Sequence, residues 1–167
     1  GTPAEVTAAL VTAGTKVEAT NATVEITSNP SISQLNAIAA ETGGVVKATL
    51  AAASLSNLAS LSTASTDDIT ITVSNAASTG VTATDLSTLG GKTAGTVTVS
   101  NAIAISGTPA EVTAALVTDA TKVAVTDVTV TISNTPTISV LNDIAAETTG
   151  VVTATLAANS LSNLGSL

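Results

Sequence analysis

The sequence predicts an α/β repeat solenoid in which each coil of about 26 residues holds a short helix and one or two parallel strands, as in LRR-like or β-solenoid-like proteins. Three observations predict this fold. Residues 1–61 align without a gap with residues 107–167, with 44 identities in 61 positions. A helix signal followed by a strand signal recurs along the chain. Leucine or valine anchors recur at intervals of 29, 23, 28, 26, 29 and 23 residues, at Val6, Leu35, Leu58, Leu86, Val112, Leu141 and Leu164.

The alignment also predicts the domain organisation. We expect one continuous solenoid fragment, in which residues 1–106 form a first long repeat of four coils. Residues 107–167 are expected to form a partial second repeat of two coils and a helix. The two copies are offset by 106 residues, and the string GTPAEVTAALVT begins both. Because the uneven coil lengths recur in the second copy, the group of four coils is the larger repeating unit.

Three kinds of segment carry helix signals. The string TPAE at Thr2 and again at Thr108 places Thr at the N-cap, Pro at N1 and Glu at N3, which is a capping box with a compatible proline. Residues 31–44 carry apolar side chains at helical spacing, and glycines that can end a helix follow them. Residues 54–62 carry leucines three apart. The expected apolar faces consist of Ile32, Leu35, Ile38 and Ala39 in the second segment, and of Leu55, Leu58 and Leu61 in the third.

A segment that alternates between β-branched and polar residues follows the helix signals. TITVS (70–74), TVTVS (96–100) and TVTIS (129–133) share this pattern, which is typical of strands with one buried face. A helix followed by a strand, repeated, predicts parallel strands joined by right-handed crossovers. The expected inward residues are Val24, Ile26, Val46, Ala48, Leu50, Ile69, Ile71, Val73, Val97, Val99, Val128, Val130, Ile132, Val152, Ala154 and Leu156.

Two further features concern how the strands stack. The longer coils contain a second extended piece, residues 16–20 and 101–106, which forms either a second sheet or a bent continuation of the first. Glu25 and Lys47 occupy equivalent outward positions in adjacent coils, and both are Thr in the second copy, at 131 and 153. Opposite charges on neighbouring strands are mildly favourable, and Thr–Thr pairs serve as well. We therefore expect these two positions to be neighbours.

The composition excludes several classes of function. The chain has no His, Cys, Arg, Met or aromatic residue, and its formal net charge is −8. Without a basic patch or stacking aromatics, we expect no nucleic-acid binding. The apolar runs are too short to span a bilayer, so we expect no membrane insertion. Without imidazole or thiolate we expect no enzyme, and the four lysines (Lys16, Lys47, Lys92 and Lys122) are interpreted as solvent-exposed charges.

Asp67 and Asp68 form the one adjacent acidic pair. Carboxylate oxygens are calcium ligands, so the pair is a weak candidate for a calcium site. The preferred interpretation is a polar turn before the strand, with no cofactor, because no EF-hand loop or glycine–aspartate nonapeptide surrounds the pair.

About a fifth of the residues are Thr, and many fall on the outward positions of the expected strands. If those strands stack, their hydroxyl and methyl groups form a regular ladder, which is the candidate binding surface of the chain. It could contact ice, a glycan or another surface. Its members are Thr70, Thr72, Thr96, Thr98, Thr129 and Thr131.

At residues 131–157 (TISNTPTISVLNDIAAETTGVVTATLA) the chain resembles repeats of very large secreted or cell-surface proteins of marine cyanobacteria and other marine bacteria. The helix starts at Gly1–Val6 and Gly107–Val112 are similar to the companion unit of those repeats. One departure is Asn in place of the Asp expected after the strand Ser, at Asn134. The resemblance implies an extracellular structural, adhesive or surface-layer role, and it supplies no functional residue.

Together these observations predict a structural repeat segment of a large extracellular or cell-surface protein, which forms a stalk, filament or surface coat. The expected partners are copies or neighbouring repeats of the same protein, joined head to tail, and a surface glycan is a further candidate. The alternative is a binding module, an adhesin or an ice- or glycan-binding domain, that uses the threonine ladder.

Overall fold

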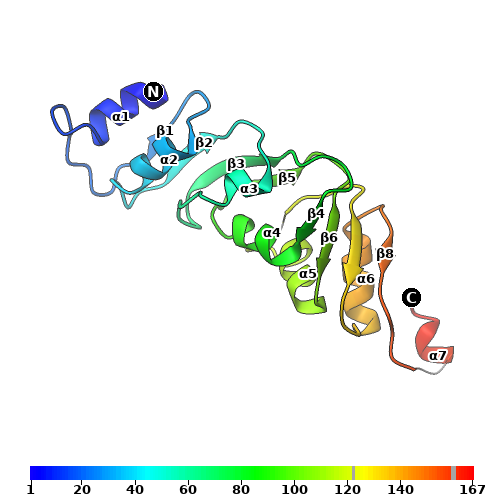
Figure 1. The fold of residues 1–167 in the computed structure, drawn as a ribbon. Helices are drawn as coiled ribbons and strands as arrows, with labels where there is room; N and C mark the ends of the chain where they lie inside the picture. The colour runs from blue at the N-terminus through cyan, green and yellow to red at the C-terminus, as the bar shows by residue number, and fades with distance from the viewer. Residues whose placement is uncertain (122, 159–160) are drawn as a thin grey trace.

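The structure is a computed structural model that describes residues 1–121, 123–158 and 161–167, and it describes no side chain for residues 161 and 162. One or two parallel strands separate successive helices along the chain, and the two termini lie at opposite ends of the molecule (Figure 1). The helices are α1 (Pro3–Leu10), α2 (Ile32–Ala39), α3 (Leu55–Leu58), α4 (Ala83–Gly90), α5 (Pro109–Leu116), α6 (Ile138–Ala146) and α7 (Leu161–Leu164). The strands are β1 (Val24–Glu25), β2 (Val46–Thr49), β3 (Asp68–Val73), β4 (Gly80–Thr82), β5 (Val97–Val99), β6 (Ala104–Gly107), β7 (Thr129–Ile132) and β8 (Val152–Thr153).

The helices begin where the sequence predicts. Thr2 and Thr108 are the N-caps of α1 and α5, and in both helices the Thr side chain and the Glu three residues later complete a capping box. Ser31 and Gln34 form a third box at the start of α2. Each box satisfies two backbone N–H groups that a helix start otherwise leaves without a partner.

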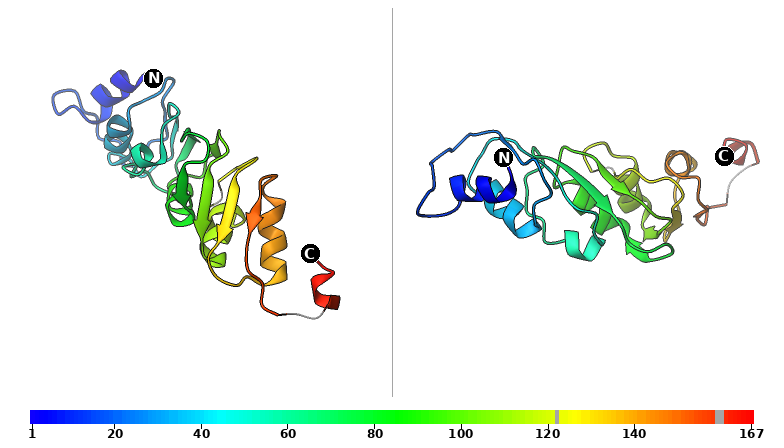
Figure 2. Two further views of the ribbon diagram at one scale, coloured as in Figure 1. Left: turned by 45° about the vertical axis from the view of Figure 1, so that its right-hand side comes forward. Right: turned by 90° about the horizontal axis from the view of Figure 1, so that it is seen from above.

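The strands form two four-stranded parallel sheets. The first has the order β1-β2-β3-β5 and the second has the order β4-β6-β7-β8. The two sheets follow one another along the length of the molecule, as the two further views show (Figure 2). The strands therefore do not stack in simple chain order, because β4 skips β5 and pairs with β6.

The predicted solenoid is therefore wrong. That fold needs the corresponding strands of successive repeats to occupy equivalent places in one continuous stack. Residues 24–25 correspond to residues 130–131 at the 106-residue offset, yet β1 lies in the first sheet and β7 in the second. The protein is an α/β fold with two parallel sheets.

The strand β3 explains the division. Its first half, residues 68–70, pairs with β2, and its second half, residues 71–73, pairs with β5. The chain then turns at Ser78, which has a φ of 62°, and enters β4, the first strand of the other sheet. Alternation of apolar and polar residues predicts that a segment is a strand, but the same side chains suit either sheet.

The core is aliphatic and follows the predicted alternation. Every expected inward residue from Val24 to Ile132 is buried, whereas Val152, Ala154 and Leu156 are only half-buried. Leu35, Ile38 and Leu86 contribute the helical side of the core at 0% exposure. The aliphatic side chains of Val, Ile, Leu and Ala thus suffice for a thin layer between sheet and helices.

The structure also decides two predictions about strand neighbours. Of the two extra extended pieces, residues 101–106 contribute β6 and so belong to the second sheet, whereas residues 16–20 form no strand. Glu25 and Lys47 are register partners, as are Thr131 and Thr153, which confirms that these positions are neighbours.

Candidate functional site

The predicted threonine ladder is divided between the two sheets. Thr70 and Thr72 lie on β3, Thr98 lies on β5 and Thr96 directly precedes β5, so all four belong to the first sheet. Thr129 and Thr131 lie on β7, in the second sheet. All are exposed except Thr72, which is half-buried.

Within each sheet the threonines form short rows. Thr49 is the register partner of Thr70, and Thr72 is the register partner of Thr98. On β7, Thr131 lies between Ser106 and Thr153. The structure therefore brings together rows two or three side chains wide, rather than one ladder along the molecule.

Charged side chains occupy the row next to these threonines. Glu25, Lys47 and Asp68 are successive register partners on β1, β2 and β3. The Lys47 ammonium lies 3.5 Å from the Asp68 carboxylate, and both side chains are about half exposed. Such a pair contributes little to stability, but it interrupts the hydroxyl surface.

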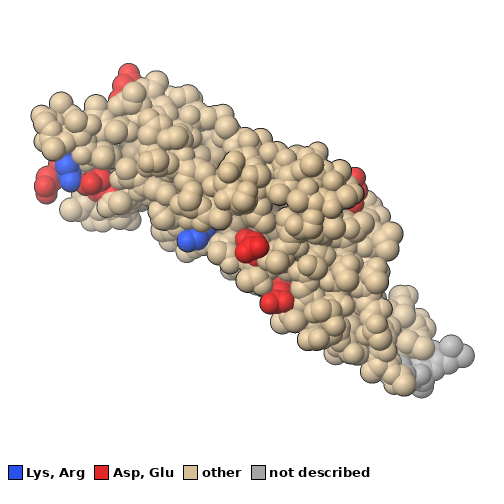
Figure 3. Space-filling model, viewed as in Figure 1, with Lys and Arg blue, Asp and Glu red and all other residues tan. Residues whose placement is uncertain are grey.

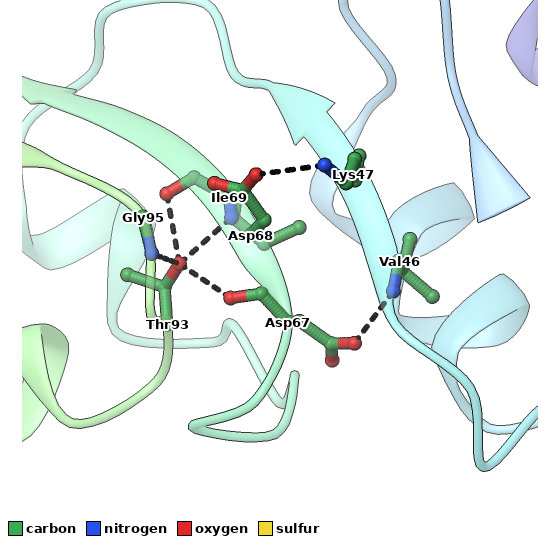
Figure 4. Close-up of polar contacts among 7 residues, drawn as sticks. All are labelled: Val46, Lys47, Asp67, Asp68, Ile69, Thr93 and Gly95. Carbon is green, nitrogen blue, oxygen red and sulfur yellow. Dashed lines mark hydrogen bonds and ion pairs between the residues drawn. The ribbon is translucent and has the colours of Figure 1, made fainter. Parts of the chain in front are cut away.

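Asp67 has a different role from its neighbour. It is buried at 4% exposure, and its two carboxylate oxygens accept hydrogen bonds of 2.8 Å from the backbone N–H groups of Val46 and Ala64. Asp67 thereby joins the start of β2 to the turn before β3 (Figure 4). Asp68 points away from Asp67 and toward Lys47 (Figure 4).

This geometry does not fit the calcium site considered for the pair. Consecutive side chains at the start of a strand point to opposite faces, so the carboxylates of Asp67 and Asp68 do not converge. Both Asp67 oxygens already have backbone partners. Within the described ranges, no group of three or more acidic side chains is placed to hold a metal ion.

Thr93 is a residue that the sequence pattern did not single out. It is buried at 5% exposure, in the turn before β5. Its hydroxyl, which has one proton to donate, lies 2.8 Å from the carbonyl oxygen of Asp67 and 2.9 Å from that of Ile69, and it accepts from the N–H groups of Ile69 (2.7 Å) and Gly95 (2.8 Å). One side chain thus connects the starts of two neighbouring strands (Figure 4).

In the part of the chain that the structure describes, the same arrangement occurs at three places, and we call each one a Thr-Gly bridge: Thr42 with Gly44, Thr93 with Gly95, and Thr148 with Gly150. In each bridge the Gly N–H donates to the Thr hydroxyl two residues earlier, at 2.8–3.0 Å. The Thr hydroxyl also reaches a carbonyl of the preceding strand segment, at Ala22, Ile69 or Val128.

The glycine of each bridge is required by space. A Cβ atom on Gly44, Gly95 or Gly150 would lie 2.4, 2.5 or 2.1 Å from a carbonyl oxygen of the neighbouring segment. Contacts of that length do not occur between a real Cβ and an oxygen, so glycine lets the two segments approach. The recurring spacing of Thr and Gly before a strand is the sequence signal that could have revealed the bridges.

A second feature is a hollow of about 530 Å³ between α3 and α4. Leu55, Leu58, Leu61, Val81 and Leu89 supply its apolar wall, and all five are buried. Asp85 and Lys92 are its charged lining residues. Figure 3 shows that charged side chains are sparse over the face of the molecule seen there.

No protein-family model, curated protein or solved structure matches the chain. Over the described residues, no helix is long and apolar enough to cross a membrane. The function of the chain must therefore be inferred from the geometry of its own residues.

Proposed function

We propose that the chain is a structural segment of a large extracellular or cell-surface protein, where it contributes to a stalk, filament or coat, and that it is not an enzyme. This proposal rests on one observation, which is that the buried polar side chains bond to the protein's own backbone. Both Asp67 oxygens and the Thr93 hydroxyl are engaged by backbone groups of neighbouring strands. Groups used in this way hold the strands together rather than meeting a substrate.

The surface and composition support the same role. The chain has neither Cys nor His. Such a chain offers no readily oxidised thiol, which suits a protein outside the cell. Head-to-tail contact with copies or neighbouring repeats of the same protein is the partner interaction that we propose.

The experiment that tests this role is electron microscopy of the native material that contains the chain. Long, uniform fibres or rods would support the structural role. Discrete particles that never associate, in preparations where the chain is intact, would contradict it.

The threonine surface is a second candidate function, favoured by the register pairs Thr49–Thr70 and Thr72–Thr98, in which every side chain except that of Thr72 is exposed. Its test is the double variant Thr70→Tyr and Thr98→Tyr, with Thr129→Tyr on the second sheet as the matched control. If the first sheet binds ice or a glycan, the double variant loses that binding and the control keeps it. Equal ice or glycan binding by the unchanged chain, the double variant and the control variant would rule out this surface.

A further inference from the structure

The outer strand β4 has one edge without a strand neighbour. It is the first strand of the second sheet, and among the described residues it pairs with β6 and with no other strand. The preceding part of the chain does not cover it, because residues 50–53 bond to β3 instead: Leu50 donates to Thr70 and Ala53 donates to Thr72. The chain then enters α3, which leaves the β4 edge open.

The hollow between α3 and α4 follows this open edge. All three residues of β4 line it, and they come from both faces of the strand, since Val81 is buried while Gly80 and Thr82 are exposed. Nothing lies within 4 Å of the position that a Cβ on Gly80 would occupy. We call the β4 edge together with the lining residues Leu55, Leu58, Ala59, Asp85 and Lys92 the β4 groove.

The pairing on the other side of β4 shows which kind of neighbouring strand β4 pairs with. There β6 runs parallel, with Gly80, Val81 and Thr82 in register with Ala104, Ile105 and Ser106. Ile105 is buried at 1% exposure beside Val81, and Ser106 is exposed. A strand on the free edge would likewise place alternate apolar side chains toward the leucines of the groove.

Two charges indicate which peptide fits. Asp85 lies at the carboxyl end of β4, where its carboxylate accepts a 2.7 Å hydrogen bond from the Thr82 hydroxyl. Lys92 lines the same hollow two residues past the end of α4, and none of the ion pairs between described residues includes it. For a parallel strand, we assign a basic residue near its carboxyl end to Asp85, and we assign the acidic partner of Lys92 to its amino end.

We propose that the β4 groove binds an extended peptide segment of another protein, which adds to β4 as a parallel strand. The segment has alternating apolar side chains, an acidic residue before them and a basic residue after them. Backbone hydrogen bonds to an open edge provide affinity, and the side-chain pockets and charges provide selectivity. This binding goes beyond the structural role, which would stand even if the groove were empty.

The probe is an acetylated, dye-labelled heptapeptide whose centre copies Ala102–Ser106, with Glu before it and Lys after it. Its matched control has Lys and Glu exchanged. We expect fluorescence anisotropy to show saturable binding of the probe, about two- to fivefold tighter than the control at low salt. A version with Pro at the central Ala should bind at least about tenfold more weakly, because Pro removes a backbone donor.

Two protein variants and one control variant test where the probe binds. Ala59→Trp fills the groove from an exposed position, and it should weaken probe binding at least tenfold, whereas Ala145→Trp, on the exposed side of α6, should not. Lys92→Glu should abolish the preference between the two peptides, because each peptide then places one charge against an unlike charge and one against a like charge. Circular dichroism establishes that each variant is folded.

Two outcomes would overturn the proposal. One is probe binding that Ala59→Trp leaves unchanged, which would place the site elsewhere. The other is sedimentation that shows dimers abolished by Ala59→Trp while neither peptide binds, which would make a second copy of the chain the occupant.

Discussion

At the scale of single residues, buried polar side chains bond to the backbone of neighbouring strands. Thr93 satisfies two N–H groups, and Asp67 satisfies two more. An unsatisfied buried donor costs more free energy than a formed hydrogen bond contributes. Replacing such residues should therefore affect stability far more than replacing exposed threonines.

Thr93→Val should lower the free energy of unfolding by about 2–4 kcal/mol, because it leaves the N–H groups of Ile69 and Gly95 without an acceptor. Urea unfolding followed by circular dichroism measures the change. Thr70→Val is the matched control, since Thr70 is exposed on β3, and it should change stability by less than about 0.5 kcal/mol. Equal effects of the two substitutions would show that the bridge contributes nothing.

Gly95→Ala should lower the free energy of unfolding by about 1–3 kcal/mol, because the added Cβ would clash with the Ile69 carbonyl oxygen. Gly14→Ala provides the comparison, because a Cβ there has no atom within 4 Å. That control should be neutral or slightly stabilising, through loss of freedom in the unfolded chain. Thermal unfolding of both variants checks the prediction, and a Gly95→Ala protein as stable as the unchanged chain would contradict it.

At the scale of elements, one sequence occurs in two environments. Helices α1 and α5 both read PAEVTAAL, yet α5 packs closely against two helices, α4 and α6, whereas the main helix contact of α1 is with α2. Val112 and Ala115 on α5 are fully buried, whereas Val6 is half-buried and Ala9 is exposed at the matching positions of α1. Packing rather than propensity therefore distinguishes the two helices.

Hydrogen exchange should show this difference directly. Because the two segments are identical, their chemical exchange rates are the same and any difference arises from structure. We expect the amides of α5 to exchange at least about tenfold more slowly than those of α1, since opening α5 disrupts two helix contacts. Mass spectrometry of peptides that extend to Ala13 or Asp119, where the two copies first differ, distinguishes the segments and provides the measurement. Equal protection would contradict the described packing.

The elements were largely predictable because their signals are local. Capping boxes at Thr2 and Thr108 depend on three neighbouring residues, and the strands depend on simple alternation. The Thr-Gly bridges and the β4 groove were not predicted, because each depends on segments far apart in the sequence. Asp67 shows the same limit: its neighbour Asp68 suggested a shared ligand, but strand geometry separated the two carboxylates.

At the scale of the whole molecule, the error in fold class has one physical source. A strong internal repeat suggested that equivalent segments occupy equivalent places. In the structure, β3 divides its pairing between β2 and β5, and the next strand opens a second sheet. The sheet that a strand joins depends on the positions of several turns at once. No local sequence pattern predicts that choice.

The stability of the molecule should fall at both extremes of pH. Hydrogen bonds from the Thr2 and Thr108 N–H groups lower the pKa of Glu5 and Glu111, and a hydrogen bond to Glu41 raises the pKa of Lys16. A carboxyl group whose pKa is lowered by folding stabilises the fold at pH values above its pKa in the unfolded chain, about 4.3, and this contribution is lost on acidification. A Lys whose pKa is raised by folding stabilises the fold at pH values below its pKa in the unfolded chain, about 10.4, and this contribution is lost as the pH rises.

Melting temperature measured against pH tests this expectation. The double variant Glu5→Gln and Glu111→Gln should flatten the acid side, and Glu41→Gln should flatten the alkaline side. Asp119→Asn, which changes an exposed turn, is the control for loss of one negative charge. Unchanged profiles in the first two variants would show that these groups do not control the pH dependence.

The short strand pairings of the two sheets have a mechanical consequence. The termini lie at opposite ends, and the register between neighbouring strands ranges from two residue pairs at β1–β2 to four at β6–β7. A pull on the two ends therefore loads several small interfaces in series, and the weakest yields first. We expect the chain to lengthen in small steps at modest force, so that it absorbs a sudden load instead of transmitting it.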